Sequence, residues 1–449
     1  MRHALTAVAL CALLAAGPLS AKVSPQEAAR LGQDLTPNGA EKAANKDGAI
    51  PAWSGGLTTA PPCFKKGGRY CDPFESDKPL YTITPQNVAQ YEKFLSPGQK
   101  AMFAKHPTYK MMVYPSRRTH AQPQWVNDAV KANATRAELG GNGEAVSGAS
   151  IGTPFPIPQT AHEYVWNHKL RFRGEGGRHY NNQFAVTTAG NYNQVTLRED
   201  ITFNYSQKNA TPTNLDNVAI YFLQVVTAPT RLAGTITLVH ETMDQVKEPR
   251  RAWQYNPGQR RLRRAPNVGY DNPGTASDGL RTNDQYDAFN GAMDRYSWKL
   301  VGKADMIIPY NSYNLASGKH KYADIMKKSH INQDLARYEM HRVWIVDSVT
   351  KPNTTHLYKR RTFYIDEDSW GMVLVDVYDR RDQLWRWQEQ HPIMYYDRPF
   401  PGAAGETIYD LQSNRYLSQA FSNEHPEFSD EDFKPSYFDP ANVSKQAIR

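Results

Sequence analysis

The stretch from about residue 194 to residue 390 most constrains the fold, because short apolar segments recur there with the two-residue period of β-strands. Two polar turns, at 366–369 and 379–382, separate strand-like segments rich in β-branched and aromatic residues. Turn residues of this kind bond to their own backbone, which favours a meander of strands over helices. The pattern predicts a mainly β protein built on one large, curved antiparallel sheet.

A sheet of this length must bury one of its faces, so it either curls around a ligand cavity or closes over a packed core. Near-continuous apolar runs at 220–223 and 343–346 predict strands that are covered on both faces. If the sheet stays half open, side chains of its inner face would line a site for an apolar ligand. The candidate lining residues are Phe222, Trp253, Trp344, Phe363 and Leu374.

Residues 1–21 have the layout of a cleavable secretory signal. A basic start precedes an apolar run at 4–16, and small residues follow at 17–21. The run is too short to anchor the chain, and no later segment reaches the roughly 18–20 apolar residues that spanning a bilayer needs. Cys11 lies within the run and not at the cleavage point, which disfavours a lipoprotein. We expect cleavage after Ala21 and a periplasmic mature protein without a transmembrane segment.

The mature chain keeps two cysteines, Cys63 and Cys71, on either side of a short loop with a Gly-Gly pair. The glycines allow a tight turn that would bring the two sulfur atoms together, and export favours oxidation. A metal site or redox pair is the alternative, but no histidine lies nearby and the spacing is not Cys-x-x-Cys. We predict a disulfide that fixes a local loop.

The densest basic group is formed by Arg260, Arg261, Arg263 and Arg264, in a chain of formal net charge +8. These residues follow the turn 256–259 and would occupy the return strand of a hairpin. The group is either a solvated strand face paired with nearby acids or a docking surface for an acidic partner or anionic lipid head groups. Nucleic acid is not expected, because the chain has no recognition motif.

A search for catalytic motifs finds no nucleophile elbow, phosphate-binding loop or dinucleotide fingerprint, so we predict neither catalytic residues nor a cofactor. His162 and His168 are six residues apart and would lie on different faces of a helix, which argues against a metal site. The three acids at 366–368 are interpreted as residues that solvate a hairpin turn. The sequence therefore favours a protein that is not an enzyme.

The mature chain divides into three regions that differ in composition. Residues 22–136 are predicted to be helix and loop, with helix starts at Ser24-Pro25, Thr84-Pro85 and Ser96-Pro97. A linker rich in glycine and proline spans 137–158. The sheet, with a C-terminal loop extension, would occupy 159–449.

Four segments, at 22–32, 35–43, 50–56 and 247–282, resemble a proteobacterial envelope family known as domain of unknown function 1329. The resemblance covers nearly all of the mature chain. It implies a fold like that of the lipoprotein-localisation proteins LolA and LolB, which is an incomplete antiparallel β-barrel with helices over its opening. It also implies a functional link to exporters of the resistance-nodulation-division class, because genes of the family commonly occur beside them.

The leading hypothesis is a periplasmic carrier or accessory protein that accepts a lipid or other hydrophobic molecule in a half-open barrel and exchanges it with a membrane exporter. The second is a structural adaptor with a closed core, whose basic hairpin docks an inner-membrane exporter or an outer-membrane protein. The third is a hydrolase whose catalytic residues form no recognised motif. A solvent-connected pocket lined by apolar strand residues would separate the first from the second.

Overall fold

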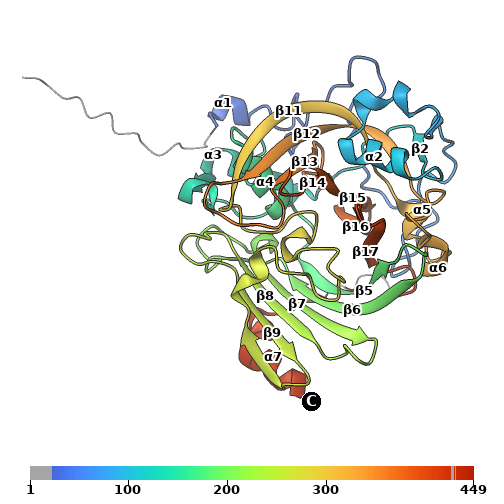
Figure 1. Cartoon of the computed structure of the whole chain (residues 1–449). Helices are drawn as coiled ribbons and strands as arrows, with labels where there is room; N and C mark the ends of the chain where they lie inside the picture. Colours follow the sequence, from blue (N-terminus) through green and yellow to red (C-terminus); the bar gives the residue numbers. More distant parts are fainter. Residues whose placement is uncertain (1–22, 426–428, 430, 449) are drawn as a thin grey trace, which may run out of the picture.

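The structure is a computed structural model that describes residues 23–425, 429 and 431–448 (Figure 1). The predicted signal at 1–21 lies outside the described residues. The protein is mainly β, and fifteen strands belong to one sheet in the order β1-β2-β12-β13-β14-β15-β16-β17-β5-β6-β7-β8-β9-β10, with β11 beside β12. Neighbours are antiparallel except β2 and β12, so the predicted fold class is confirmed.

The strands of this sheet are β1 (Tyr81–Ile83), β2 (Met111–Tyr114), β5 (Gly176–Val186), β6 (Tyr192–Thr202), β7 (Val218–Ala228), β8 (Ile236–Thr242), β9 (Arg251–Asn256), β10 (Arg261–Arg264), β11 (Tyr296–Pro309), β12 (Tyr338–Thr350), β13 (Arg360–Asp366), β14 (Met372–Tyr378), β15 (Leu384–Tyr395), β16 (Phe400–Asp410) and β17 (Arg415–Phe421). A separate hairpin consists of β3 (Glu138–Gly140) and β4 (Ala145–Ser147). The polar turns predicted at 366–369 and 379–382 do join β13 to β14 and β14 to β15.

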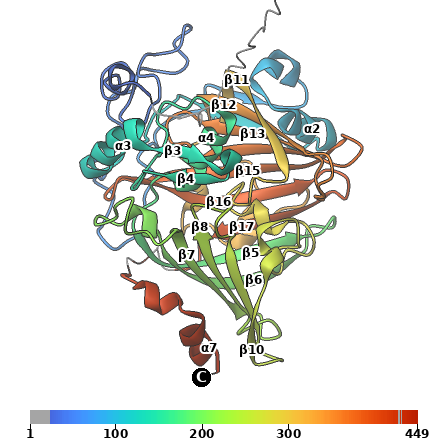
Figure 2. The ribbon, with the colours of Figure 1, turned by 90° about the vertical axis from the view of Figure 1, so that its left-hand side faces the viewer.

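The large sheet curves around an interior but does not close. Figure 1 shows β11–β14 across the top and β5–β9 across the bottom, with β15–β17 between them. Register shifts, for example at His391/Pro392 and Ser418/Phe421, mark bulges that help to bend the strands. At one end β10 pairs only with β9, so the sheet is a half-open barrel. Figure 2 shows α4 and the β3–β4 hairpin in front of the sheet.

The α-helices are α1 (Pro25–Ala28), α2 (Pro97–Lys105), α3 (Gln124–Arg136), α4 (Ala161–Leu170), α5 (Tyr313–Ala316), α6 (Tyr322–Ile325) and α7 (Pro440–Ile448). Short 3-10 helices are η1 (Val88–Gln90), η2 (Glu92–Phe94), η3 (Gly141–Gly143), η4 (Asn204–Ser206), η5 (Pro266–Gly269), η6 (Asn283–Gln285) and η7 (Pro435–Phe438). None of the helices in the described part of the chain is long and apolar enough to cross a membrane.

Two of the three predicted helix starts are confirmed. Ser24 and Ser96 form capping boxes at the first residues of α1 and α2. The α-helix predicted at Thr84-Pro85 is wrong, because the chain makes a turn there and continues as the 3-10 helix η1. Asn87 closes that turn, since its Oδ1 accepts a hydrogen bond from the Thr84 amide at 2.7 Å and its Nδ2 donates to the Thr82 carbonyl at 3.0 Å. Such a side-chain turn competes with helix formation.

The N-terminal region and the glycine- and proline-rich segment are both joined to the large sheet. In the N-terminal region, β1 and β2 extend the large sheet, and Cys63 and Cys71 form the predicted disulfide. In the glycine- and proline-rich segment 137–158, the Val146 amide donates to the Met243 carbonyl at 3.1 Å, and Val146 is buried. This segment is thus held against the sheet by backbone hydrogen bonds.

The C-terminal extension, predicted as a loop, contains η7 and α7. Asp439 precedes Pro440, and its Oδ1 accepts a hydrogen bond from the Ala441 amide at 2.8 Å, as a helix cap does. Both elements cover the outer face of β7–β9, where Phe438 stacks on Tyr221 with ring centroids 5.5 Å apart. The outer face of the run at 220–223 is therefore covered, while Ile220 and Phe222 on the inner face are half-buried.

Candidate functional site

The inner face of β6–β8 borders a cavity of about 130 Å³. Helix α4 and the irregular segment 268–290 form its other walls. Side chains alternate along the strands, so that Phe222 and Val239 face the cavity while Leu223 and Leu238 face η7 and α7. The apolar part of the wall consists chiefly of Trp166, Leu170, Ile220, Phe222, Val239 and Phe289.

Charged side chains also reach this cavity. Its wall contains four cations, Lys169, Arg173, Arg250 and Arg281, but two carboxylates, Glu241 and Asp287. Because cations outnumber carboxylates, the wall carries a local excess of positive charge.

Three of the four cations are engaged by carboxylates. Nε of Arg250 donates to Glu241 at 2.6 Å, and Nζ of Lys169 lies 3.9 Å from the same carboxylate. Nη1 of Arg173 donates to Asp287 at 2.6 Å. Burial lowers the pKa of Arg173 to about 10 although Asp287 acts against this shift. Glu241 and Asp287 are therefore both engaged in ion pairs.

Arg281 differs from the other three cations. Its side chain is buried, and its guanidinium group makes one hydrogen bond, from Nη1 to the Thr282 carbonyl at 3.4 Å. Within the described ranges it has no ion pair, and its Nε has no hydrogen-bond partner. Burial lowers the pKa of Arg281, while Glu406 and Tyr286 act in the opposite direction. Arginine nevertheless stays protonated in proteins. A charge without an ion-pair partner among the described residues therefore lies at the cavity wall, with its guanidinium carbon 5.8 Å from the centroid of the Tyr286 ring.

The five candidate lining residues lie in different environments. Phe222 is on the cavity wall. Trp253 lies on the outer face of β9, where its ring contacts His240 at 4.9 Å between centroids. Trp344 is half-buried and contacts Tyr164 of α4 at 5.0 Å. Phe363 and Leu374 are both 0% exposed in the main core. Phe363 pairs with Val375, so it faces the side of the sheet opposite to Leu374, and both sides are filled there.

The predicted arginine hairpin is formed by β9 and β10. Arg260, Arg261, Arg263 and Arg264 are all exposed, and none makes an ion pair with a residue that the structure describes. The guanidinium carbon of Arg264 lies 5.1 Å from the ring centroid of Trp253. The four arginines thus form a positively charged surface on the edge strand of the sheet.

The interpretation of the acids at 366–368 as turn-solvating residues is wrong, because all three are buried. Arg118 donates two hydrogen bonds to Asp368, at 2.7 and 3.0 Å, and Lys303 contacts Glu367 at 3.0 Å. Asp366 has no cationic partner of this kind among the described residues, and its Oδ1 accepts no hydrogen bond. Burial, reinforced by Asp368, raises the pKa of Asp366 to about 6.

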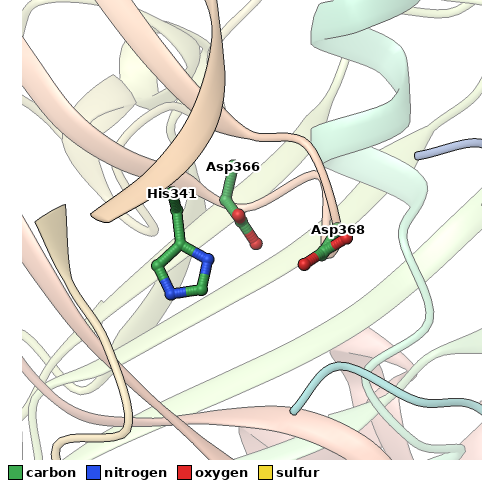
Figure 3. Close-up of side chains that lie close together, drawn as sticks. All are labelled: His341, Asp366 and Asp368. Carbon is green, nitrogen blue, oxygen red and sulfur yellow. The ribbon is translucent and has the colours of Figure 1, made fainter. Parts of the chain in front are cut away.

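His341 joins Asp366 and Asp368 in a cluster whose nearest donor atoms all lie within 4.8 Å of one another (Figure 3). One imidazole and two carboxylates are ligands that a divalent cation can use. However, both oxygens of Asp368 accept hydrogen bonds from Arg118, whose positive charge would repel a metal ion. Nε2 of His341 lies 3.0 Å from Glu339. We therefore assign this cluster to an ion-pair network.

A relative from Pseudomonas aeruginosa, described as an uncharacterized protein, is 49% identical over 447 residues, which cover 99% of this chain and 98% of the relative. A putative outer membrane lipoprotein-sorting protein domain from Vibrio parahaemolyticus has a TM-score of 0.42 and 13% identity over 64% of this chain and 98% of that one. A DUF1329 family protein from Desulfovibrio piger has a TM-score of 0.40 and 13% identity over 60% and 92%. A LolA superfamily protein from Nitrosomonas europaea has a TM-score of 0.37 and 10% identity over 63% and 98%.

The family assignment rests on the sequence itself. The model of the family described as "Protein of unknown function (DUF1329)" matches residues 82–449, which include every strand of the large sheet except the first residue of β1. The chain belongs to the DUF1329 family.

Proposed function

We propose that this protein is a periplasmic, non-enzymatic carrier that holds a hydrophobic molecule inside its half-open sheet. The observation that carries the proposal is the cavity of about 130 Å³ beside β6–β8. Protein cores are packed to the density of organic crystals, so unfilled space next to large apolar side chains is unusual. A cavity with an apolar wall and a few polar groups is typical of a ligand site.

The size of the cavity limits the cargo. An engineered apolar cavity of about 150 Å³ in another protein binds benzene. The cavity of about 130 Å³ therefore suits one ring or a short acyl segment better than the several chains of a lipoprotein anchor. We propose a small cargo with one apolar portion.

Binding of a fluorescent fatty-acid probe tests this proposal. The parent protein is titrated with probes of several chain lengths, and we expect saturable binding by at least one of them. Val239→Phe would place a larger side chain in the cavity, so it should abolish this binding while the variant stays folded. Absence of binding to the parent at every chain length would refute the carrier function.

Val225→Phe is the matched control. Val225 lies on the adjacent strand β7 but on its outer face, where it packs near Leu223 and α7. The substitution adds the same volume as Val239→Phe, and we expect it to leave probe affinity unchanged. Equal losses of binding in both variants would mean that general disturbance of the sheet, rather than filling of the cavity, is responsible.

The second candidate function is that of an adaptor, which the exposed arginines of β10 favour. In this proposal the positively charged edge docks an acidic surface of an envelope partner, such as an exporter of the resistance-nodulation-division class or an outer-membrane protein. Exposed charge of one sign accelerates and orients association, and salt weakens it. Docking and carrying are compatible, because none of the four arginines lines the cavity.

A further inference from the structure

We propose that the cargo is a hydrophobic anion and that Arg281 binds its charged group. This inference rests on the proposed carrier function and specifies the class of molecule. Arg281 is 5% exposed and lies on the wall of the cavity. Burying a charge without a partner is strongly unfavourable, so a buried guanidinium group next to empty space indicates that the ligand supplies the partner.

The acids near Arg281 form no ion pair with it in the described part of the chain. Glu199 is buried nearby, but its two oxygens accept hydrogen bonds from Tyr286 at 2.8 and 2.9 Å and from Gln224 at 2.8 Å. Glu406 is held in the same way by Gln419 at 2.8 Å. Burial raises the pKa of both carboxyl groups, which favours their neutral forms. Neutral donors thus satisfy the acids that could otherwise have paired with Arg281.

The position of Arg281 is fixed by local backbone geometry. The Gly274 amide donates to the Arg281 carbonyl at 2.9 Å, which closes a narrow loop. A Cβ at position 274 would lie 2.6 Å from the guanidinium carbon, so glycine leaves the space that this group occupies. The charged group is therefore held in place before a ligand arrives, which reduces the entropy lost on binding.

The chemistry of the site favours one ligand class. A planar guanidinium group binds carboxylates and phosphates through two parallel hydrogen bonds. Phe222 and Val239 supply apolar surface in the same cavity, and the excess of cations on its wall favours an anion over a neutral molecule. A single-chain or single-ring carboxylate meets both requirements, and the size of the cavity favours a short one.

Isothermal titration calorimetry with octanoate and 1-octanol tests the inference, because the two ligands share a chain length and differ in charge. At pH 7 we expect the parent to bind octanoate more tightly than 1-octanol. Arg281→Gln should weaken octanoate binding by about ten- to hundredfold, the usual effect of losing a hydrogen bond to a charged group. Affinity for 1-octanol should change by less than about twofold. Arg381→Gln is the control, because this arginine is exposed in the β14–β15 turn.

Three further measurements apply if Arg281→Gln does not fold. Arg281→Lys keeps the positive charge and should retain part of the preference for octanoate. In the parent, the preference should shrink as the pH falls from 7 to about 4, because a carboxylic acid becomes protonated in this range while arginine does not. Acetate reports whether a free small anion suffices, and we expect it to bind far more weakly than octanoate.

The outcomes separate this inference from the carrier function. Equal binding of octanoate and 1-octanol to the parent, unaffected by Arg281→Gln, would overturn the anion proposal and leave the carrier intact. Equal affinity for acetate and octanoate would also overturn it, because the site would then recognise anions without an apolar portion. Loss of both ligands in folded Arg281→Gln would assign Arg281 a structural role. Failure of the parent to bind any probe would refute the carrier function itself.

Discussion

Arg281, in the segment 280–290, and Arg361, which contacts that segment, are both buried, but among the described residues only Arg361 has a protein counter-ion. Its Nη2 donates to Asp284 at 2.9 Å, and its guanidinium carbon lies 4.9 Å from the ring centroid of Phe289. Burial acts to lower the pKa of both arginines. For Arg361, Asp284 together with Tyr296 and Tyr358 more than offsets burial, so its pKa is raised. The pKa of Arg281 stays lowered.

This difference distinguishes two halves of the interior. Beside β13 and β14 the concave side of the sheet is filled with the stacked rings of Trp298 and Phe363. Phe289 packs against both rings and separates them from the cavity, whose wall it also forms. Beside β7 and β8 a cavity remains, and the charge on its wall is incompletely paired. One part of the sheet thus contributes mainly to stability, while the other has the properties of a binding site.

Matched phenylalanine substitutions should give the largest effect. Phe363→Ala would leave a void in the packed half and cost about 4 kcal/mol of unfolding free energy. Phe222 already borders empty space, so Phe222→Ala should cost about 1–2 kcal/mol. Urea unfolding measures both values. Similar costs would contradict the division of the interior into a packed half and a cavity half.

Matched arginine substitutions sharpen the same comparison. Arg361→Met should lower the free energy of unfolding by at least about 3 kcal/mol, because it leaves the buried Asp284 with one fewer cationic partner. Arg281→Met removes a charge that has no ion-pair partner among the described residues, so it should change stability by less than about 1 kcal/mol or increase it. A large destabilisation by Arg281→Met in urea would reveal a structural ion pair.

The pH dependence of stability tests the buried Asp366. Its folded-state pKa of about 6 lies above the usual value of about 3.9, so the folded protein binds this proton more tightly than the unfolded chain does. Its contribution favours folding at low pH and is lost as the pH rises from about 4 to about 6. Between pH 4 and 7, Asp366→Asn should therefore gain on the order of 2 kcal/mol relative to the parent. A constant difference in unfolding free energy would contradict the raised pKa.

The smallest effect is expected at the arginine hairpin. Replacing Arg260, Arg261, Arg263 and Arg264 by Gln should change unfolding free energy by no more than about 0.5–1 kcal/mol, because exposed charges contribute little to stability. In contrast, association with an acidic envelope partner should weaken and lose its salt dependence. A large loss of stability without a change in association would show that these side chains serve the fold.

The sequence allowed the sheet and its turns to be predicted, because period-two alternation and turn chemistry are local signals. It did not reveal which face of each strand is concave. Trp253 and Phe222 both belong to strand-like segments, yet only the pairing register directs Trp253 to the outer face. The burial of Asp368 depends on Arg118, which lies 250 residues away. The sequence does not indicate Arg281 as a site residue, because the segment around it lacks the periodicity of a strand or a helix. By contrast, Asp439-Pro440 was a local signal for α7 that could have been used.

Native mass spectrometry of the protein isolated from its native cells tests the central claim most directly. We expect a bound population whose excess mass corresponds to a small hydrophobic anion that organic extraction releases. Val239→Phe, isolated in the same way, should have the mass of the protein alone. A parent protein that carries no small molecule, with a mass identical to that of Val239→Phe apart from the substitution, would contradict the account.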